Sequence, residues 1–131
     1  MSILFVLMIL LSFFIGAIPF GLIIGRLAAR VDITRRGSGN IGAANVAREI
    51  GIRWGLVTLI LDMLKGFLPL TIGMKIPMQY HNIFLIILSL SLLLGHIYSP
   101  FLRFKGGKGV STGFGIFLAL SPISAIISFC I

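Results

Sequence analysis

The stretch Ile3–Gly25, ILFVLMILLSFFIGAIPFGLIIG, contains no charged residue. As a helix rising about 1.5 Å per residue it would span roughly 35 Å, which is enough to cross the hydrocarbon core of a bilayer. No basic residue precedes it, whereas Arg26 and Arg30 follow it. A cleaved signal peptide has the opposite order. The stretch therefore predicts a retained membrane helix.

The composition of the whole chain favours the same environment. Hydrophobic residues make up 58% and charged residues 11% of the 131 residues. Soluble domains carry about 25% charged residues, so this chain has too little polar surface to coat a water-soluble globule. The net charge of +8 is compatible with anionic lipid or a phosphorylated ligand, and the apolar content argues against nucleic acid. We expect a single membrane domain over residues 1–131.

Three further apolar stretches, each close to the roughly 20 residues that a spanning helix needs, follow the first. They lie at 54–74, 82–102 and 110–131. Helices are the open-chain way to satisfy backbone hydrogen bonds in lipid. The sequence therefore predicts an all-α, polytopic transmembrane helix bundle with four membrane segments. Pro19, Pro69 and Pro122 are expected to kink or stagger these helices.

The connecting loops differ strongly in charge. The loops at 26–53 and 103–109 hold nine of the eleven Lys and Arg residues. Two crossings separate these loops, so they lie on one side of the membrane. The positive-inside rule makes that side cytoplasmic and places the N-terminus outside.

The end of the chain carries no polar flank after the last apolar stretch. We therefore expect the chain to be truncated at its C-terminus. The single cysteine, Cys130, lies in this apolar run and is expected to be a buried, inert thiol rather than a nucleophile.

The first loop contains the motif Gly37–Arg48, GSGNIGAANVAR. Glycines allow successive backbone amides to turn toward one point, which creates an anion-binding nest. Ser38 and Asn40 add side-chain donors, and Arg48 adds a planar fork suited to phosphate. If a helix begins near Ile41, its N-terminus would also face the anion. The alternative is a glycine-rich turn that serves helix packing alone.

The second loop contains the motif Phe104–Gly113, FKGGKGVSTG. Its glycine spacing is not that of a Walker A loop, but backbone amides and the mobile ammonium groups of Lys105 and Lys108 would likewise surround a phosphate. The alternative is a basic membrane flank, with Gly109 and Gly113 forming a helix contact. Two such loops on one face predict two phosphate-bearing substrates, or one substrate held twice.

Other polar residues need separate weighing. Asp62 and Lys65 lie three apart in a membrane segment and either form a packing ion pair or support the site. His96 is a candidate general base or orienting donor, or a structural histidine. His81 lies in the outer link. The sequence predicts no metal site, no cofactor and no covalent nucleophile.

These motifs together resemble one family. Ser38–Arg48 and Gly95–Val110 resemble the first two motifs of the PlsY-type acyl-phosphate:glycerol-3-phosphate acyltransferases, and Asp62–Gly66 resembles their intramembrane DxxKG segment. The resemblance implies a bacterial inner-membrane protein with about seven helices in the complete fold. It also implies acyl transfer to the 1-hydroxyl of glycerol 3-phosphate, giving lysophosphatidic acid, in the first acylation of phospholipid synthesis.

The resemblance also implies roles for residues. Ser38, Gly39 and Asn40 would hold the phosphate of acyl phosphate, with help from the Gly106–Gly107 turn. Arg48 and Lys108 would hold glycerol 3-phosphate, and Lys105 would share the phosphate charge. With His96 from the residue-level interpretation, Lys105 is a candidate for support of the reaction. The substrate-binding candidates are Ser38, Gly39, Asn40, Asn45, Arg48, Gly106, Gly107, Lys108 and Gly109. The family's third motif is absent from this chain, so we expect the isolated fragment to be inactive.

Two other functions remain open at this stage. A transporter or channel for a phosphorylated or anionic solute would also need basic loops and kinked helices, although only Asp62 and Lys65 are charged within a membrane segment. A structural subunit that packs through its glycines would tolerate the loss of Arg48 or Lys108.

Overall fold

The computed structural model describes residues 3–130, and the side chain of Cys130, expected to be inert, lies outside the described side chains. Over this range the chain forms helices and no strand, which confirms the all-α prediction. In chain order the helices are α1 (Ile3–Ala17), α2 (Phe20–Ala29), the 3-10 turn η1 (Ile33–Arg35), α3 (Ala43–Ile50), α4 (Ile52–Met74), α5 (His81–Ile97), the 3-10 turn η2 (Pro100–Leu102), α6 (Val110–Leu120) and α7 (Pro122–Cys130).

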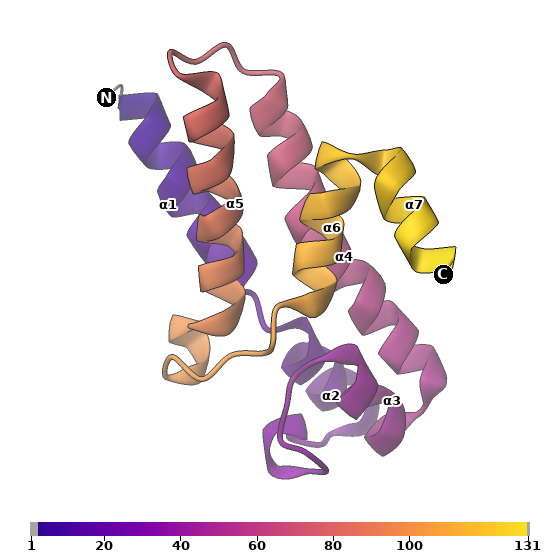
Figure 1. The fold of residues 1–131 in the computed structure, drawn as a ribbon. Coiled ribbons are helices and arrows are strands. Elements are labelled where there is room, and N and C mark those ends of the chain that lie inside the picture. Colours follow the sequence, from indigo (N-terminus) through magenta and orange to yellow (C-terminus); the bar gives the residue numbers. More distant parts are fainter. Residues whose placement is uncertain (1–2, 131) are drawn as a thin grey trace.

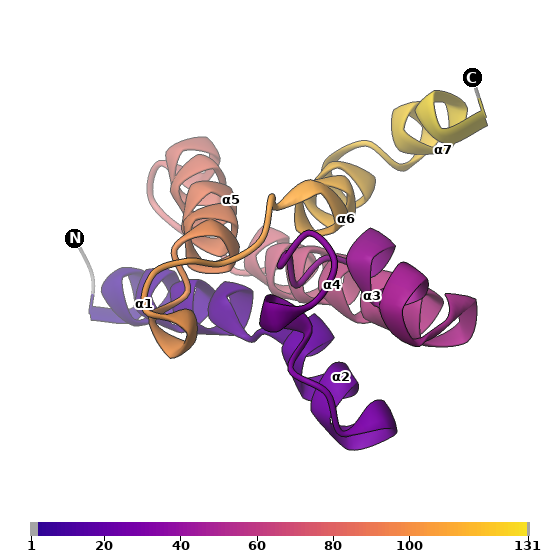
Figure 2. The same ribbon diagram turned by 90° about the horizontal axis from the view of Figure 1, so that it is seen from below.

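Three apolar helical stretches are long enough to cross a membrane, namely Ile3–Ala29, Ile52–Met74 and His81–Leu102. The first is not a single straight helix, because α1 ends at Ala17 and α2 starts again after Pro19 and runs in another direction (Figure 2). Pro19 has no N–H and cannot continue the helical ladder. The buried Lys65 ammonium donates to the carbonyl of Ile18 at 2.8 Å, which also accepts from the N–H of Phe20 at 3.1 Å, and so stabilises the break.

The apolar stretch predicted over 110–131 is divided into two helices at Pro122, where the sequence predicted a kink or a stagger. Helix α6 ends at Leu120, and α7 begins at Pro122 and turns back beside it (Figure 1). The eleven residues of α6 are too few for the roughly 20 that a crossing requires. Pro122 supplies the physical reason, since its ring fits the first turn of a new helix but not the interior of an old one. Pro69, in contrast, lies inside an uninterrupted α4.

Two close helix crossings set the frame of the bundle. At the crossing of α1 and α5, a Cβ on Gly95 would lie 2.1 Å from the carbonyl oxygen of Phe13. At the crossing of α4 and α6, a Cβ on Gly115 would lie 2.0 Å from the carbonyl oxygen of Met63. Only glycine permits backbones to approach so closely, a packing mode favoured in membranes. The second crossing presses the start of α6 against the middle of α4, where Asp62 lies.

Helix α3 and the loop before it lie at one end of the bundle, against the start of α4 (Figure 1). The turn Gly51 separates α3 from α4, and Gly55 of α4 packs against the backbone of Ala43 and Ala47. Val46 is fully buried in a small apolar cluster with residues of α2 and η1. This packing directs the N-terminus of α3 toward α4 and α6.

Candidate functional site

The loop at residues 36–42, called here the first glycine loop, is held by the side chain of Asn45. The Asn45 amide nitrogen donates to the carbonyl oxygens of Arg36 at 3.1 Å and Asn40 at 2.9 Å, with a longer contact to Ile33 at 3.3 Å. Its oxygen accepts from the backbone N–H of Ser38 at 3.0 Å. Asn45 is 1% exposed. Asn45 therefore shapes the loop, a role more specific than the phosphate contact expected from the sequence.

The first glycine loop leads directly into α3. The side-chain oxygen of Asn40 accepts from the backbone N–H of Gly42 at 2.8 Å, and Gly42 is the N-cap residue of α3. This confirms that a helix begins just after Ile41. The first amides of a helix lack intrahelical partners and favour anions. Arg48 extends from the same helix, with its Nε donating to the carbonyl of Ala44 at 3.3 Å.

The loop at residues 103–109, called here the second glycine loop, is held by its backbone. The N–H of Gly106 donates to the carbonyl of Ile97 at 2.9 Å, and that of Gly107 donates to the carbonyl of His96 at 3.1 Å. These two amides close the end of α5 and are already paired. The expected phosphate contact from the Gly106–Gly107 turn therefore finds no support in the geometry. Gly109, with a φ of 77°, starts α6 as its N-cap.

A buried polar cluster lies where α4, α5 and α6 meet. His96 Nδ1 lies 3.1 Å from the hydroxyl of Thr112 and 3.9 Å from Asp62 Oδ1. Asp62 Oδ1 lies 2.8 Å from the ammonium of Lys65. All four residues are at most 5% exposed. Gly107 packs directly on the His96 ring, since a Cβ there would lie 2.3 Å from Nε2. The second glycine loop thus positions His96.

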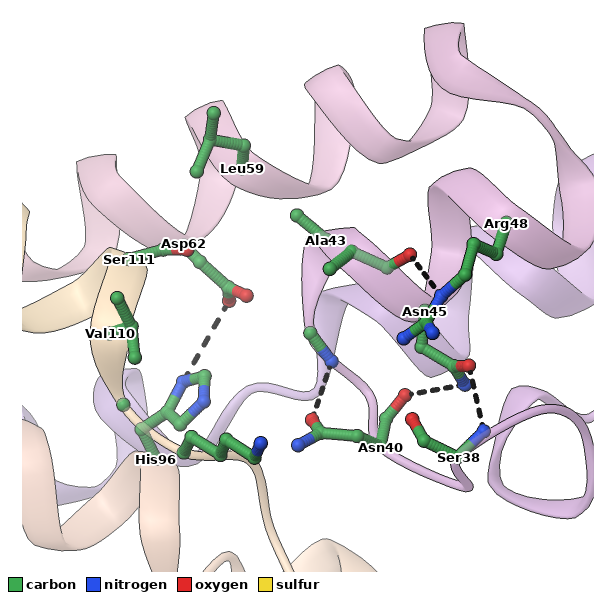
Figure 3. A pocket seen from close by; sticks show the side chains of 14 residues that line it. Ser38, Asn40, Ala43, Asn45, Arg48, Leu59, Asp62, His96, Val110 and Ser111 are labelled. Carbon is green, nitrogen blue, oxygen red and sulfur yellow. Dashed lines mark hydrogen bonds and ion pairs between the residues drawn. The ribbon is translucent and has the colours of Figure 1, made fainter.

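The two loops and the polar cluster open onto one cavity of about 310 Å³ (Figure 3). Figure 3 shows Ser38, Asn40 and Arg48 on one side of this cavity, and Asp62 and His96 on the other. The lining residues are Ser38, Asn40, Gly42, Ala43, Ala44, Asn45, Arg48, Leu59, Asp62, His96, Lys108, Gly109, Val110 and Ser111. Loops separated by about half of the chain therefore share a pocket.

Most of the candidates predicted from the sequence line this cavity, but not all of them do. Gly39, Lys105, Gly106 and Gly107 are not among the lining residues. The N–H of Gly39 is used in a turn to the carbonyl of Arg36 at 2.9 Å. Sequence reasoning anticipated the N-terminus of α3 but did not select Ser111, although the start of an apolar helix directly after Gly109 was a usable signal for it.

The electrostatics of the cavity favour an anion. Its lining contributes the cationic side chains Arg48 and Lys108 and the donors of Ser38 and Asn40, against one carboxylate, Asp62, which is paired with Lys65. Cationic and amide donors of this kind bind phosphate oxygens. Among residues 3–130, no group of three or more His, Cys, Asp or Glu side chains could hold a metal ion.

Asp32 fixes the segment that precedes the first glycine loop. Its Oδ1 accepts from the hydroxyl of Thr34 at 2.5 Å and from the Thr34 N–H at 3.0 Å, and its Oδ2 accepts from Arg26 at 3.3 Å. The hydrogen bond from the Thr34 hydroxyl is the main reason that the pKa of the Asp32 carboxyl lies below its usual 3.8. Asp32 thereby caps η1 outside the cavity.

Comparison with known proteins identifies relatives along almost the entire chain. A glycerol-3-phosphate acyltransferase family model matches residues 6–131. A glycerol-3-phosphate acyltransferase of Desulfotalea psychrophila is 49% identical over 121 residues, which cover 91% of this chain and 61% of the relative. One of Fusobacterium nucleatum is 47% identical over 119 residues, which cover 91% of this chain and 60% of the relative.

Solved structures agree with the sequence relatives. The crystal structure of PlsY, an integral membrane glycerol 3-phosphate acyltransferase, in its glycerol 3-phosphate form matches with a TM-score of 0.86 and 40% identity, over 96% of this chain and 62% of PlsY. The lysophosphatidic acid form of PlsY matches with a TM-score of 0.85. The chain spans roughly three fifths of the length of these relatives. A fold and a sequence shared at this level mean that the chain belongs to the glycerol-3-phosphate acyltransferase family.

Proposed function

We propose that the protein transfers a fatty acyl group from acyl phosphate to the 1-hydroxyl of glycerol 3-phosphate and releases lysophosphatidic acid and phosphate. The observation that carries the proposal is the single cavity shared by both glycine loops, with Arg48 and Lys108 in its lining. The names of the relatives and of PlsY, which has glycerol 3-phosphate and lysophosphatidic acid forms, support the same reaction. The cavity is also large enough for a small phosphorylated ligand (Figure 3).

The proposed reaction needs little chemistry from the protein. The glycerol hydroxyl oxygen forms the new ester bond with the acyl carbonyl carbon, the bond from that carbon to phosphate breaks, and an oxygen of a substrate phosphate takes the hydroxyl proton. The protein then has to hold two anions close together and aim one at the other, which supplies much of the rate. Cations and loop donors offset the repulsion and the developing charge.

We assign the binding roles by place in the cavity. Ser38 and Asn40, with the N-terminus of α3, hold the phosphate of acyl phosphate, and Arg48 and Lys108 hold glycerol 3-phosphate. Ser111, at the start of α6, lines the cavity beside Lys108. Gly39, Gly106 and Gly107 keep a structural role in this assignment, because their amides are paired within the chain.

We place the protein in the bacterial plasma membrane, with the two glycine loops on the cytoplasmic side and the N-terminus outside. The basic residues of the loops at 26–53 and 103–109 support this orientation. Cysteine labelling from either side of sealed cells tests it, because a residue such as Arg53→Cys should react only with reagents that enter the cytoplasm.

The decisive test is acyl transfer in proteoliposomes that contain the product of the complete reading frame. Palmitoyl phosphate and labelled glycerol 3-phosphate should give labelled lysophosphatidic acid. Arg48→Ala should lower kcat/KM for glycerol 3-phosphate at least tenfold, because hydrogen bonds to charged groups contribute about 1.5–3 kcal/mol and about 1.4 kcal/mol corresponds to a factor of ten.

Arg53→Ala is the matched control, since Arg53 is a nearby arginine outside the cavity lining. Its kinetics should stay within about twofold of the wild type, as for most surface changes. Uptake of glycerol 3-phosphate into the vesicles without acylation would favour the transporter interpretation instead. Equal activity of the Arg48→Ala and Arg53→Ala variants would argue for a structural role of the first loop.

A further inference from the structure

Asp62 presents an acceptor that the chain itself does not satisfy. Its Oδ1 is buried and lies 2.8 Å from the Lys65 ammonium in an ion pair, and no other group among the residues that the structure describes donates a hydrogen bond to it. The side chain is 1% exposed and lines the cavity (Figure 3). A carboxylate has about four lone-pair sites, so one cationic neighbour leaves acceptor capacity that a donor from elsewhere can use.

A carboxylate is an unexpected group in a cavity that favours anions. Lys65 resolves the conflict, because its ammonium offsets the Asp62 charge from the side away from the cavity. Lys65 is itself fixed by its bond to the carbonyl of Ile18 and lies 5.6 Å from the ring centre of Phe20. Asp62 can therefore act as a hydrogen-bond acceptor without repelling a nearby phosphate strongly.

The remaining lining groups have the opposite character. Ser38, Asn40, Arg48 and Lys108 all bring hydrogen-bond donors, which suit phosphate oxygens. A ligand that carried only phosphate would offer the Asp62 carboxylate no hydroxyl donor. Glycerol 3-phosphate carries two hydroxyl groups beside its phosphate, and each is a donor that a carboxylate accepts well.

We propose that Asp62 is a specificity-determining residue that accepts a hydrogen bond from a hydroxyl group of the phosphorylated acceptor. The proposal rests on the proposed function and goes beyond it by assigning the recognition of the polyol part of the substrate to a buried residue of α4. Phosphate is then recognised by the loops and the hydroxyl groups by the membrane-embedded helix. A site that forms a hydrogen bond with a substrate hydroxyl group discriminates against analogues that lack this group.

The test combines changes at Asp62 with substrate analogues that each lack one hydroxyl group, and it uses the complete protein. 1,3-Propanediol monophosphate lacks the 2-hydroxyl and remains an acyl acceptor, so kcat/KM is measured for it. 1,2-Propanediol phosphate lacks the reactive hydroxyl, so its inhibition constant is compared with the KM of glycerol 3-phosphate. The wild type should disfavour at least one analogue by about tenfold or more, as expected for a lost hydrogen bond to a charged group.

Two variants probe the residue. The double variant Asp62→Ala with Lys65→Met removes both charges together, so that no unpaired buried charge is left. It should lose at least about tenfold of the wild-type discrimination against that analogue. Asp62→Asn keeps a neutral acceptor and should retain part of the discrimination. The control Thr112→Val disturbs the same buried cluster from outside the cavity lining. It should change the kinetic and inhibition constants of glycerol 3-phosphate and both analogues by the same factor.

The outcomes separate the hypotheses. Full discrimination in the double variant overturns the role of Asp62. So does a wild type that uses glycerol 3-phosphate and 1,3-propanediol monophosphate equally well and binds 1,2-propanediol phosphate as tightly as glycerol 3-phosphate. A wild type that acylates neither glycerol 3-phosphate nor 1,3-propanediol monophosphate overturns the proposed function instead. Should the variants fail to fold, isotope-edited infrared spectra of the wild type decide: glycerol 3-phosphate should shift an aspartate carboxylate band that inorganic phosphate leaves in place, and identical spectra would reject the proposal.

Discussion

The two glycine loops of the cavity are similar in composition but are held by different forces. The first glycine loop depends on one side chain, because Asn45 binds two of its carbonyls, one of its amides and a carbonyl of η1 just before it. The second glycine loop depends on backbone contacts, with Gly106 and Gly107 bound to the last turn of α5. Glycine permits a tight backbone turn in the first loop and close packing against α5 in the second. Similar glycine-rich motifs therefore do not imply similar use of their amides.

Loss of the Asn45 side chain should have the largest effect. Asn45→Ala leaves the carbonyls of Arg36 and Asn40 and the amide of Ser38 without their partner. Each of these hydrogen bonds contributes about 0.5–1.5 kcal/mol, so we expect a loss of about 3 kcal/mol for the three together and no measurable acyl transfer. Thermal unfolding in detergent and the acylation assay measure the two effects. Asn45→Asp keeps the acceptor for the Ser38 amide but loses the donor to the carbonyls. If its stability and activity equalled those of Asn45→Ala, the carbonyl contacts would account for the entire effect.

The second loop should instead be sensitive to an added methyl group. A Cβ on Gly106 would lie 1.9 Å from the carbonyl oxygen of His96, so Gly106→Ala must displace the end of α5. Overpacking of this kind costs about 1–3 kcal/mol. Gly113→Ala is the control, because its Cβ would meet only a Leu93 methyl group at 3.5 Å. Equal stability of the two variants would contradict the packing role of Gly106.

The two lysines of the second loop should differ in their effect on kinetics. Lys108 lines the cavity and Lys105 does not. Lys108→Ala should raise KM for glycerol 3-phosphate about tenfold, which corresponds to about 1.4 kcal/mol, while Lys105→Ala should change it by less than about twofold. Steady-state kinetics at saturating acyl phosphate provide the measurement. A larger effect at Lys105 would restore the role that the family resemblance implied for it.

The smallest effect is expected at Asp32, outside the cavity. The Thr34 hydroxyl lowers the pKa of Asp32, so its contribution to stability is present above pH 3.8 and is lost as the pH falls through the lowered pKa. Thr34→Val should raise that pKa and lower the melting temperature slightly at pH 6, but not near pH 2. Melting curves at the two pH values test this. A difference that persists at low pH would mean that Thr34 acts by packing.

Sequence patterns located much of this architecture. Runs of apolar residues identified the regions of α1, α4 and α5, and the two glycine motifs identified both loops of the cavity. The helix breaks were harder to place, because a proline in an apolar run can lie inside a continuous helix, as Pro69 does, or accompany a break, as Pro19 and Pro122 do. Which of these occurs depends on groups that other helices supply at the break, such as the Lys65 ammonium at the carbonyl of Ile18.

The sequence by itself determined that this chain is a helical membrane protein, and it predicted two loops suited to phosphate, because apolar length, loop charge and the residue types of the motifs are local properties. Only the tertiary structure decided which donors are free. The amides of Gly106 and Gly107 are paired with α5, whereas Asp62, far from both loops in the chain, faces the same cavity as Arg48. Hydrogen-bond pairing and burial depend on what other segments bring to a residue, and no local pattern records them.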